Sequence, residues 1–212
     1  EFEGDSAGHG DLLLLTAYRV LRLQDDSLHV SVLAGVETPT GYTHESNRDG
    51  GRFEVEHQPG SGSWDFALGA AVTKAWGRFS LHANVLHTFA GEGALDTDLG
   101  DSFQYNLAAV YTLGGDEPHG HAQATERHAH PSGFAADVMV ELNGEWRDRL
   151  EIDGRRDENS GGSLLYASPG FRLRLGHDVS LFASLSIPIL QHANGDGHET
   201  EFRAVAGVGF GF

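Results

Sequence analysis

The chain ends with the sequence EFRAVAGVGFGF at residues 201–212, and this stretch indicates the class of fold. In steps of two, one set of positions is apolar: Phe202, Ala204, Ala206, Val208, Phe210 and Phe212. The other set is small or polar: Arg203, Val205, Gly207, Gly209 and Gly211. Successive side chains of a strand point to opposite faces, so the alternation predicts a strand with one apolar face. A strand that runs to an aromatic last residue is typical of a membrane β-barrel, whose final strand pairs with the first.

Eight earlier segments of the chain alternate in the same way. They are residues 11–22, 28–38, 64–73, 79–90, 102–113, 134–147, 164–175 and 179–189. The clearest alternation lies within 102–113, where Phe103 and Tyr105 flank Gln104. Most segments are about 10–12 residues long, which exceeds the usual strand of a soluble sheet and suits a tilted membrane crossing.

The connections between these segments alternate between short and long. The short ones are residues 24–27, 74–78 and 176–178, and the long ones are 39–63, 91–101, 148–163 and 191–201. Membrane barrels have this asymmetry, with short periplasmic turns and long outer loops. Aromatic residues near the strand ends fit the girdles of such barrels: Trp64, Phe79, Phe89, Phe103, Trp146, Phe202 and Phe212. The alternative is a β-sandwich or lipocalin-like barrel with its apolar face inward, which does not explain these features together.

The sequence therefore predicts an all-β fold, an antiparallel up-and-down transmembrane β-barrel with nine strands in this chain. Bacterial single-chain barrels have an even number of strands. We therefore expect additional strands before the first segment, most simply one or three, or a partner chain that supplies them. The whole barrel would have about twelve strands. Residues 1–212 would form one barrel domain, with a histidine-rich periplasmic loop at 114–133. Alternatively, the number of strands is miscounted, or the first segment is not a strand of the barrel wall.

Composition narrows the classes of protein. The 212 residues include no cysteine, which excludes disulfides, CxxC metal sites and c-type haem attachment. No apolar run approaches the roughly 18 residues of a spanning helix, so a helical membrane protein is excluded. A net charge of −17 argues against nucleic-acid binding and is compatible with loops that attract cations. Residue Glu1 does not begin a signal peptide, so we expect that it was removed or that the chain begins within a longer protein.

Six short segments carry a resemblance to a known family. They are QPGSGSWD at 58–65, ANVL at 83–86, GDSFQYNL at 100–107, ELNGEW at 141–146, NSGG at 159–162 and YASPG at 166–170. From about residue 11 to 212 the chain resembles outer-membrane transporters of the type named after the meta-pathway (MetA-pathway) of phenol degradation. The resemblance implies a barrel of about a dozen strands, a signal peptide and a transport role. These motifs carry no catalytic chemistry and name no substrate.

The polar positions of the alternating strands are the first candidate site. We expect these side chains to line the lumen: Asp65, His82, Gln104, Asn106, Asp137, Glu141, Glu145, Arg172, Arg174 and Arg203. Acidic and basic walls could line a polar pore and set its selectivity. Alternatively, the charges pair across neighbouring strands and fill a closed lumen.

A histidine-rich connection is the second candidate site. It contains His119, His121, His128 and His130. Neutral imidazole is a ligand for zinc, copper or nickel, so the loop could capture metal in the periplasm. The alternative is a tolerated insertion that binds metal weakly. The acidic loops at 96–101 and 194–197 do not match a calcium loop, and we interpret them as solvated charge.

No enzymatic constellation is expected. Ser80 and His82 share a face, as do His29 and Ser31, but no nucleophile elbow surrounds either pair. The sequence therefore predicts a barrel in the bacterial outer membrane for passive transport of small solutes or ions, with a metal-linked role through the histidine loop. Its partners would be outer-membrane lipid and a small solute or metal ion, with no required cofactor. The alternative is a closed structural or metal-binding barrel, or a sheath for a partner protein, without transport. The substrate and the oligomeric state are not predicted.

Overall fold

The computed structural model describes residues 7–25, 27–46, 50–114, 134–176, 179–195 and 201–210. Within these ranges the regular structure is almost entirely β-strand, which confirms the predicted all-β class. Two single-turn 3-10 helices lie in long connections, η1 at Val55–His57 and η2 at Ala94–Asp96. None of the helices in the described ranges has the length and apolar character needed to cross a membrane.

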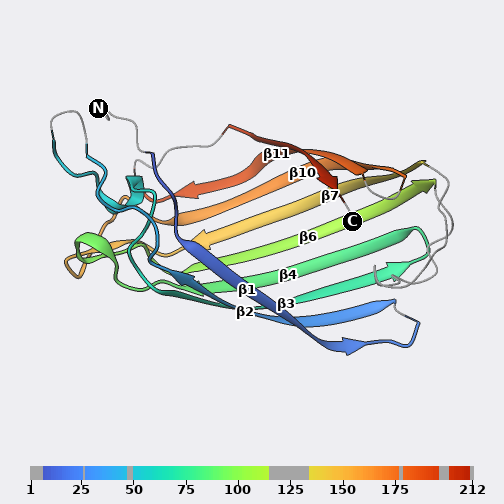
Figure 1. The fold of residues 1–212 in the computed structure, drawn as a ribbon, viewed down its shortest axis with the longest axis horizontal. Coiled ribbons are helices and arrows are strands. Elements are labelled where there is room, and N and C mark those ends of the chain that lie inside the picture. The colour runs from blue at the N-terminus through green and yellow to red at the C-terminus, as the bar shows by residue number, and fades with distance from the viewer. Residues whose placement is uncertain are drawn as a thin grey trace.

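Nine long strands form one antiparallel sheet in which each strand pairs with the next long strand along the chain. They are β1 (Leu12–Arg22), β2 (Leu28–Thr38), β3 (Asp65–Trp76), β4 (Phe79–Phe89), β6 (Ser102–Gly114), β7 (Phe134–Arg147), β10 (Gly162–Leu175), β11 (Val179–Ala193) and β12 (Arg203–Phe210). The predicted antiparallel up-and-down order is therefore confirmed. Figure 1 shows a strongly curved sheet, with β1 crossing in front of its neighbours.

The sheet is open in the described part of the chain. Strands β1 and β12 are its two edges, and each has a single neighbour. The two edge strands are not paired with each other in the described ranges. Closure into a barrel and a total of twelve strands stay predictions.

Several strand boundaries differ from the predicted ones. Strand β3 continues to Trp76 rather than Thr73, because Lys74, Ala75 and Trp76 remain paired with β4. Only Gly77 and Arg78 form the turn. Strand β11 continues to Ala193 rather than 189, and its polar end pairs with the start of β10.

A second, three-stranded sheet lies in stretches predicted as loops. It contains β5 (Thr97–Asp98), β8 (Glu151–Ile152) and β9 (Arg155–Arg156). Strands of two residues are too short to produce a periodic sequence signal, so they were not predicted. This small sheet joins the connection before β6 to the connection after β7.

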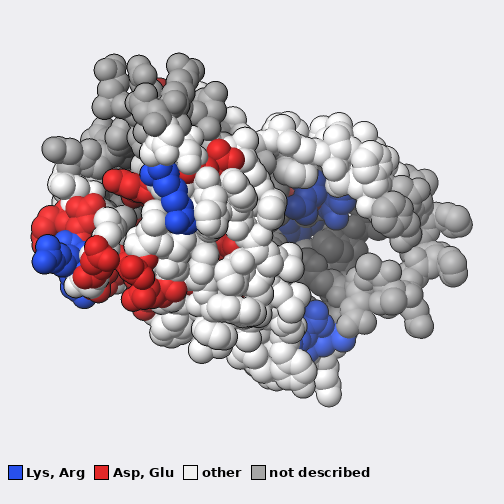
Figure 2. Space-filling model, turned by 60° about the vertical axis from the view of Figure 1, so that its left-hand side comes forward, with Lys and Arg blue, Asp and Glu red and all other residues white. Residues whose placement is uncertain are grey.

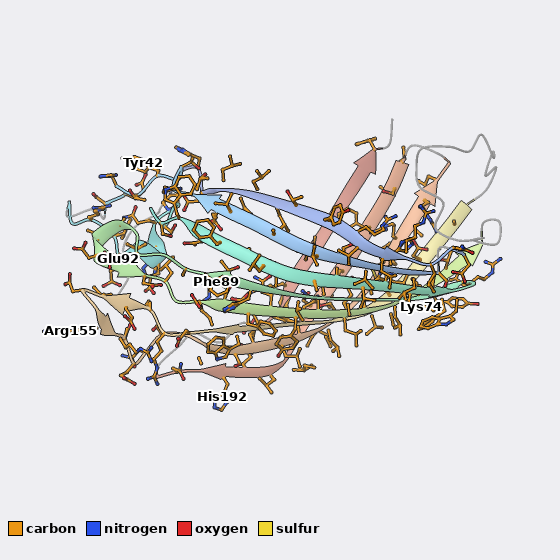
Figure 3. All side chains as sticks on the ribbon, turned by 90° about the horizontal axis from the view of Figure 1, so that it is seen from below. Tyr42, Lys74, Phe89, Glu92, Arg155 and His192 are labelled. Carbon is orange, nitrogen blue, oxygen red and sulfur yellow. The ribbon has the colours of Figure 1, made fainter. Side chains whose placement is uncertain are left out.

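The two ends of the large sheet differ in their connections. We call the end with the connections 39–64, 90–101 and 148–161 the long-connection end, and the end with the β3–β4 turn the short-connection end. Figure 3 shows Tyr42, Glu92 and Arg155 at the former and Lys74 at the latter. Strand β6 ends and β7 begins at the short-connection end, on either side of residues 115–133.

The pairing registers keep two faces separate across the sheet. Ala83, Leu107 and Leu142 are opposite one another on β4, β6 and β7, on what we call the apolar face. Asn84, Asn106 and Asn143 form the adjacent row on the polar face. The registers also place the Lys and Arg side chains of the long strands on the polar face, apart from Lys74. Because Figure 2 shows Lys and Arg on the wall of a hollow, the polar face is the one that the curved sheet encloses.

Candidate functional site

All ten residues predicted to line a lumen lie on the polar face. By strand they are Asp65 on β3, His82 on β4, Gln104 and Asn106 on β6, Asp137, Glu141 and Glu145 on β7, Arg172 and Arg174 on β10, and Arg203 on β12. The structure brings some of them together across strands. Gln104 is opposite Glu145, and Asp137 is opposite Arg172.

The centre of the polar face holds a continuous hydrogen-bonded row across five strands. The Asn106 amide donates to Asn84 Oδ1 (2.9 Å), and the Asn143 amide donates to Asn106 Oδ1 (3.1 Å). The Ser168 hydroxyl donates to Asn143 Oδ1 (2.9 Å) and is hydrogen-bonded to the Ser186 hydroxyl (2.8 Å). We call these five residues the amide–hydroxyl row. Only Asn106 among them was predicted as a site residue.

The amide–hydroxyl row satisfies polar groups that the sheet partly buries. Ser168 is only 1% exposed, and a buried polar atom without a partner costs about 1–3 kcal/mol. Linked hydrogen bonds also polarise and strengthen one another. If one of these strands shifted by one residue against its neighbour, its member of the row would move to the apolar face and lose its hydrogen bond. The row therefore favours the observed pairing of the strands from β4 to β11.

A buried carboxylate organises the polar face near the short-connection end. Asp137 is 6% exposed, and its Oδ1 accepts a hydrogen bond from the Thr112 hydroxyl (2.8 Å). The same oxygen accepts from Arg174 Nη2 at 2.9 Å. Charged donors and acceptors make the stronger hydrogen bonds of a protein, so this cluster ties β6 to β7 and β10.

Arg203 lies over an aromatic ring rather than a carboxylate. Its guanidinium carbon is 4.7 Å from the centre of the Tyr166 ring, a distance at which a cation is attracted to the ring face. Tyr166 itself is only 5% exposed. Arg203 is opposite Ser186 on β11, and the contact therefore joins β12 to β10 across the intervening strand.

Ser80 and His82, which the sequence places on one face, are in contact, but the second ring nitrogen of His82 faces a hydroxyl group rather than a carboxylate. His82 Nε2 lies 3.0 Å from Ser80 Oγ, and His82 Nδ1 lies 3.0 Å from Thr73 Oγ1. In serine hydrolases a carboxylate on the second ring nitrogen holds the tautomer and stabilises the imidazolium that forms. A threonine hydroxyl cannot supply that negative charge. The arrangement is therefore better suited to joining β3 and β4 than to activating Ser80.

Asp11 joins the connections at the other end of the sheet. Its carboxylate accepts from the backbone N–H groups of Gly41 (2.6 Å) and Ser61 (2.7 Å) and from the Ser61 hydroxyl (2.8 Å). Burial raises the pKa of Asp11, but the hydrogen bonds from Ser61 and Gly41 outweigh it, and the pKa lies below its ordinary value of 3.8. Gly41 and Gly60 pack so closely that a Cβ on Gly60 would lie 2.6 Å from Gly41 Cα.

The motif segment 58–65 explains how these connections are held. The Gln58 side chain accepts from Glu45 N–H and donates to the carbonyls of Glu45 and Phe53. At the end of the segment, Asp65 Oδ1 accepts from the Ser63 hydroxyl (2.7 Å) and from Gly91 N–H (3.0 Å). The motif therefore connects the stretch before β1, the β2–β3 connection and the β4–β6 connection, a role that the sequence did not reveal.

The predicted metal ligands and the possible ligands that the described residues bring together are different. The predicted ligands His119, His121, His128 and His130 lie outside the described residues. Among the described residues, one group of three possible ligands was not predicted, Glu54, Glu56 and His57 at η1. Both glutamates are exposed, and exposed acidic groups at this spacing are common without a metal.

Comparison with protein-family models matches residues 1–188 to the family described as "Putative MetA-pathway of phenol degradation". No curated protein matches the chain. The matched residues include β1 to β10 and most of β11, so they contain the whole amide–hydroxyl row. The resemblance inferred from the six short motifs is confirmed. Because the match covers most of the 212 residues, the chain belongs to this phenol-degradation MetA-pathway family.

Proposed function

We propose that the chain forms the wall of a bacterial outer-membrane β-barrel, along whose polar face small solutes or ions pass without chemical change. The separation of the two faces carries the proposal. The apolar face exposes large aliphatic side chains, such as Leu68 (57%), Leu107 (46%) and Val140 (56%), while the polar face is hydrogen-bonded. A membrane barrel has this arrangement, with lipid on one side and water on the other.

The aromatic residues of the apolar face support a membrane position. Trp64 and Phe66 lie at the long-connection end of β3, and Trp76 lies at its short-connection end. All three are at least half exposed, at 56%, 57% and 50%. Aromatic rings at both ends of an apolar band match the two interfaces of a bilayer. In water, an apolar surface of this extent would instead promote association.

The second candidate function is a closed barrel that presents the histidine loop or sheathes a partner. The amide–hydroxyl row favours it, because Asn84, Asn106 and Asn143 satisfy one another without a solute. The two candidates differ in whether a continuous water path exists along the polar face.

Single-channel conductance of the intact protein in a planar bilayer distinguishes the two. We expect discrete, ion-selective current steps. Glu141→Lys, on the polar face, should shift the reversal potential in a salt gradient toward anions. Arg155→Glu, on a long connection, makes a charge change of similar size at the surface and should shift it much less. A protein that inserts correctly but produces no steps refutes the passive pore and leaves the closed barrel.

We also propose that the histidine loop binds a transition metal, on the sequence pattern alone. Zinc added from the loop side should change the conductance. Replacing His119, His121, His128 and His130 together by Gln should remove that response while leaving the pore intact. An identical zinc response in the substituted protein would refute this part of the proposal.

A further inference from the structure

We propose that the path along the polar face binds small amphipathic anions, which combine an aliphatic body with one carboxylate or sulfonate group. The inference rests on the proposed pore function and names the class of solute. It is carried by an apolar patch on the enclosed face that ends at an exposed arginine.

The polar face is not polar throughout. From the middle of β1–β4 toward their long-connection end, six of its positions are apolar, and we call them the leucine patch: Leu13, Leu15, Ala17, Leu33, Ala67 and Leu86. The registers place them on this face, because Leu33 is opposite Gly69, and Gly69 is in line with Leu86 and then Gln104. Figure 3 shows β1, β2 and β3 side by side along one wall of the curved sheet.

The leucines lie across neighbouring strands and make the patch continuous. A Cβ on Gly35 would lie 2.9 Å from Leu15 Cδ1, and a Cβ on Gly69 would lie 2.9 Å from Leu86 Cδ1. Side chains from β1 and β4 therefore cover the glycines of β2 and β3. Ala67, opposite Gly35, is only 4% exposed, whereas Leu15 is 45% exposed. The patch therefore presents aliphatic surface to the hollow.

An exposed arginine borders the leucine patch. Arg19 lies two positions after Ala17 on the same face of β1. It is exposed and forms no ion pair with a described residue. The acidic residues at the opposite border, Glu37 and Asp65, are both half-buried, and Asp65 already accepts two hydrogen bonds. The charge most accessible to a molecule lying on the patch is therefore positive.

The patch and the arginine are spaced to contact one molecule. Arg19 and Leu15 lie four positions apart on β1, which is about 13 Å at about 3.3 Å per residue. The planar guanidinium matches the oxygens of a carboxylate or sulfonate, and an aliphatic body is stabilised by leaving water for the leucines. An inorganic ion makes only the first of these contacts. A molecule that has both groups makes both contacts and is held more tightly.

Alkyl sulfonates of different length test the inference, because they stay ionised and differ only in their tails. Butane-, hexane- and octane-1-sulfonate are added to single channels of the intact protein in a planar bilayer, and the concentration that halves the KCl current is measured. Full burial of a methylene is worth about 0.8 kcal/mol, or about fourfold in affinity. Because the patch covers one side of a tail, we expect the half-blocking concentration to fall about two- to fourfold per added methylene.

Variants separate the leucine patch from the pore itself. Leu15→Thr with Leu33→Thr introduces residues that favour strands, and it should lower the dependence to less than about 1.5-fold per methylene. Leu164→Thr makes the same change on the same face of β10, beyond Gln104 and Glu145, and should leave the dependence unchanged. Arg19→Gln should raise every half-blocking concentration by a similar factor, about two- to fivefold, because it removes the charge and keeps the apolar contacts.

Octylammonium carries the opposite charge on the same tail and should block only at a higher concentration than octane-1-sulfonate. Equal block by the two ions overturns the preference for anions. Half-blocking concentrations that do not change with tail length, or an unchanged dependence in the double leucine variant, overturn the inference and leave the pore standing. The patch is then covered by another part of the protein or by a partner. An inserted protein without channels refutes the proposed pore, and the inference with it.

Discussion

Removing the buried carboxylate of Asp137 should destabilise the sheet far more than removing an unpaired carboxylate on the same strand face. Asp137→Ala deletes the hydrogen bonds from Thr112 (2.8 Å) and Arg174 (2.9 Å). Hydrogen bonds to a charged group are each worth about 1.5–3 kcal/mol, which gives at least about 3 kcal/mol for the two. Both freed donors face the hollow, and the Arg174 side chain is already 47% exposed, so water recovers part of the loss. We expect a net destabilisation of about 2–3 kcal/mol.

Glu141→Ala is the matched control. Glu141 lies four residues along β7 on the same face, and it has no hydrogen bond or ion pair to any described residue. Its removal should change stability by about 0.5 kcal/mol or less. Urea unfolding in lipid vesicles, followed by the fluorescence of the three tryptophans, measures both variants. Equal losses in the two variants, or a loss below about 1 kcal/mol for Asp137→Ala, would refute the reasoning that these hydrogen bonds hold β6, β7 and β10 together.

Three further changes probe other contacts. Gly144→Ala should cost about 1–3 kcal/mol, because its Cβ would fall within the Tyr105 ring, and the urea midpoint should recover when Tyr105→Leu is added. Ser168→Ala should cost about 1–3 kcal/mol by leaving Asn143 Oδ1 without its donor, measured as a lower urea midpoint. The pKa of Asp11 in the folded protein lies below 3.8, its ordinary value in the unfolded chain. The ionised carboxylate therefore stabilises the fold above the unfolded pKa, and this stabilisation is lost as the pH falls through the lower folded pKa. Between about pH 5 and pH 3 the urea midpoint should therefore fall more for the natural protein than for Asp11→Asn, and parallel curves would contradict this.

The long strands could be predicted because each carries its own signal. Residues 134–147 alternate along most of their length, and β7 has those same bounds. Where the alternation fades, the prediction ends too early, as at Lys74 on β3 and Gln191 on β11. Those residues are held in the strand by pairing with a neighbour. A neighbour's position depends on the register, which no single segment specifies.

The polar face shows the same limit at the level of the site. Alternation places Asn106 and Asp137 on that face, but it cannot show which side chains on other strands will meet them. Thr112 and Ser168 were missed because they have no distinctive chemistry in isolation. Their roles depend on partners 25 residues away in the sequence, Asp137 and Asn143 respectively. The asparagines at 84, 106 and 143 were a usable signal, since three amides on one face can bond in a row.

Two exposed arginines of the polar face lie outside the family motifs, and this bears on where selectivity arises. The motif segments contain Asn84, Asn106, Asn143 and Ser168, whose side chains bond to one another, and Ser61 and Ser63, which hold carboxylates at the long-connection end. These residues fix registers and connections. The basic residues Arg19 and Arg172 lie outside every motif segment and form no ion pair with a described residue. The motifs are therefore stronger evidence for the fold than for the identity of the solute. Two proteins with the same motifs could carry different charges at those arginine positions, so substitutions there should change ion preference without changing the sheet.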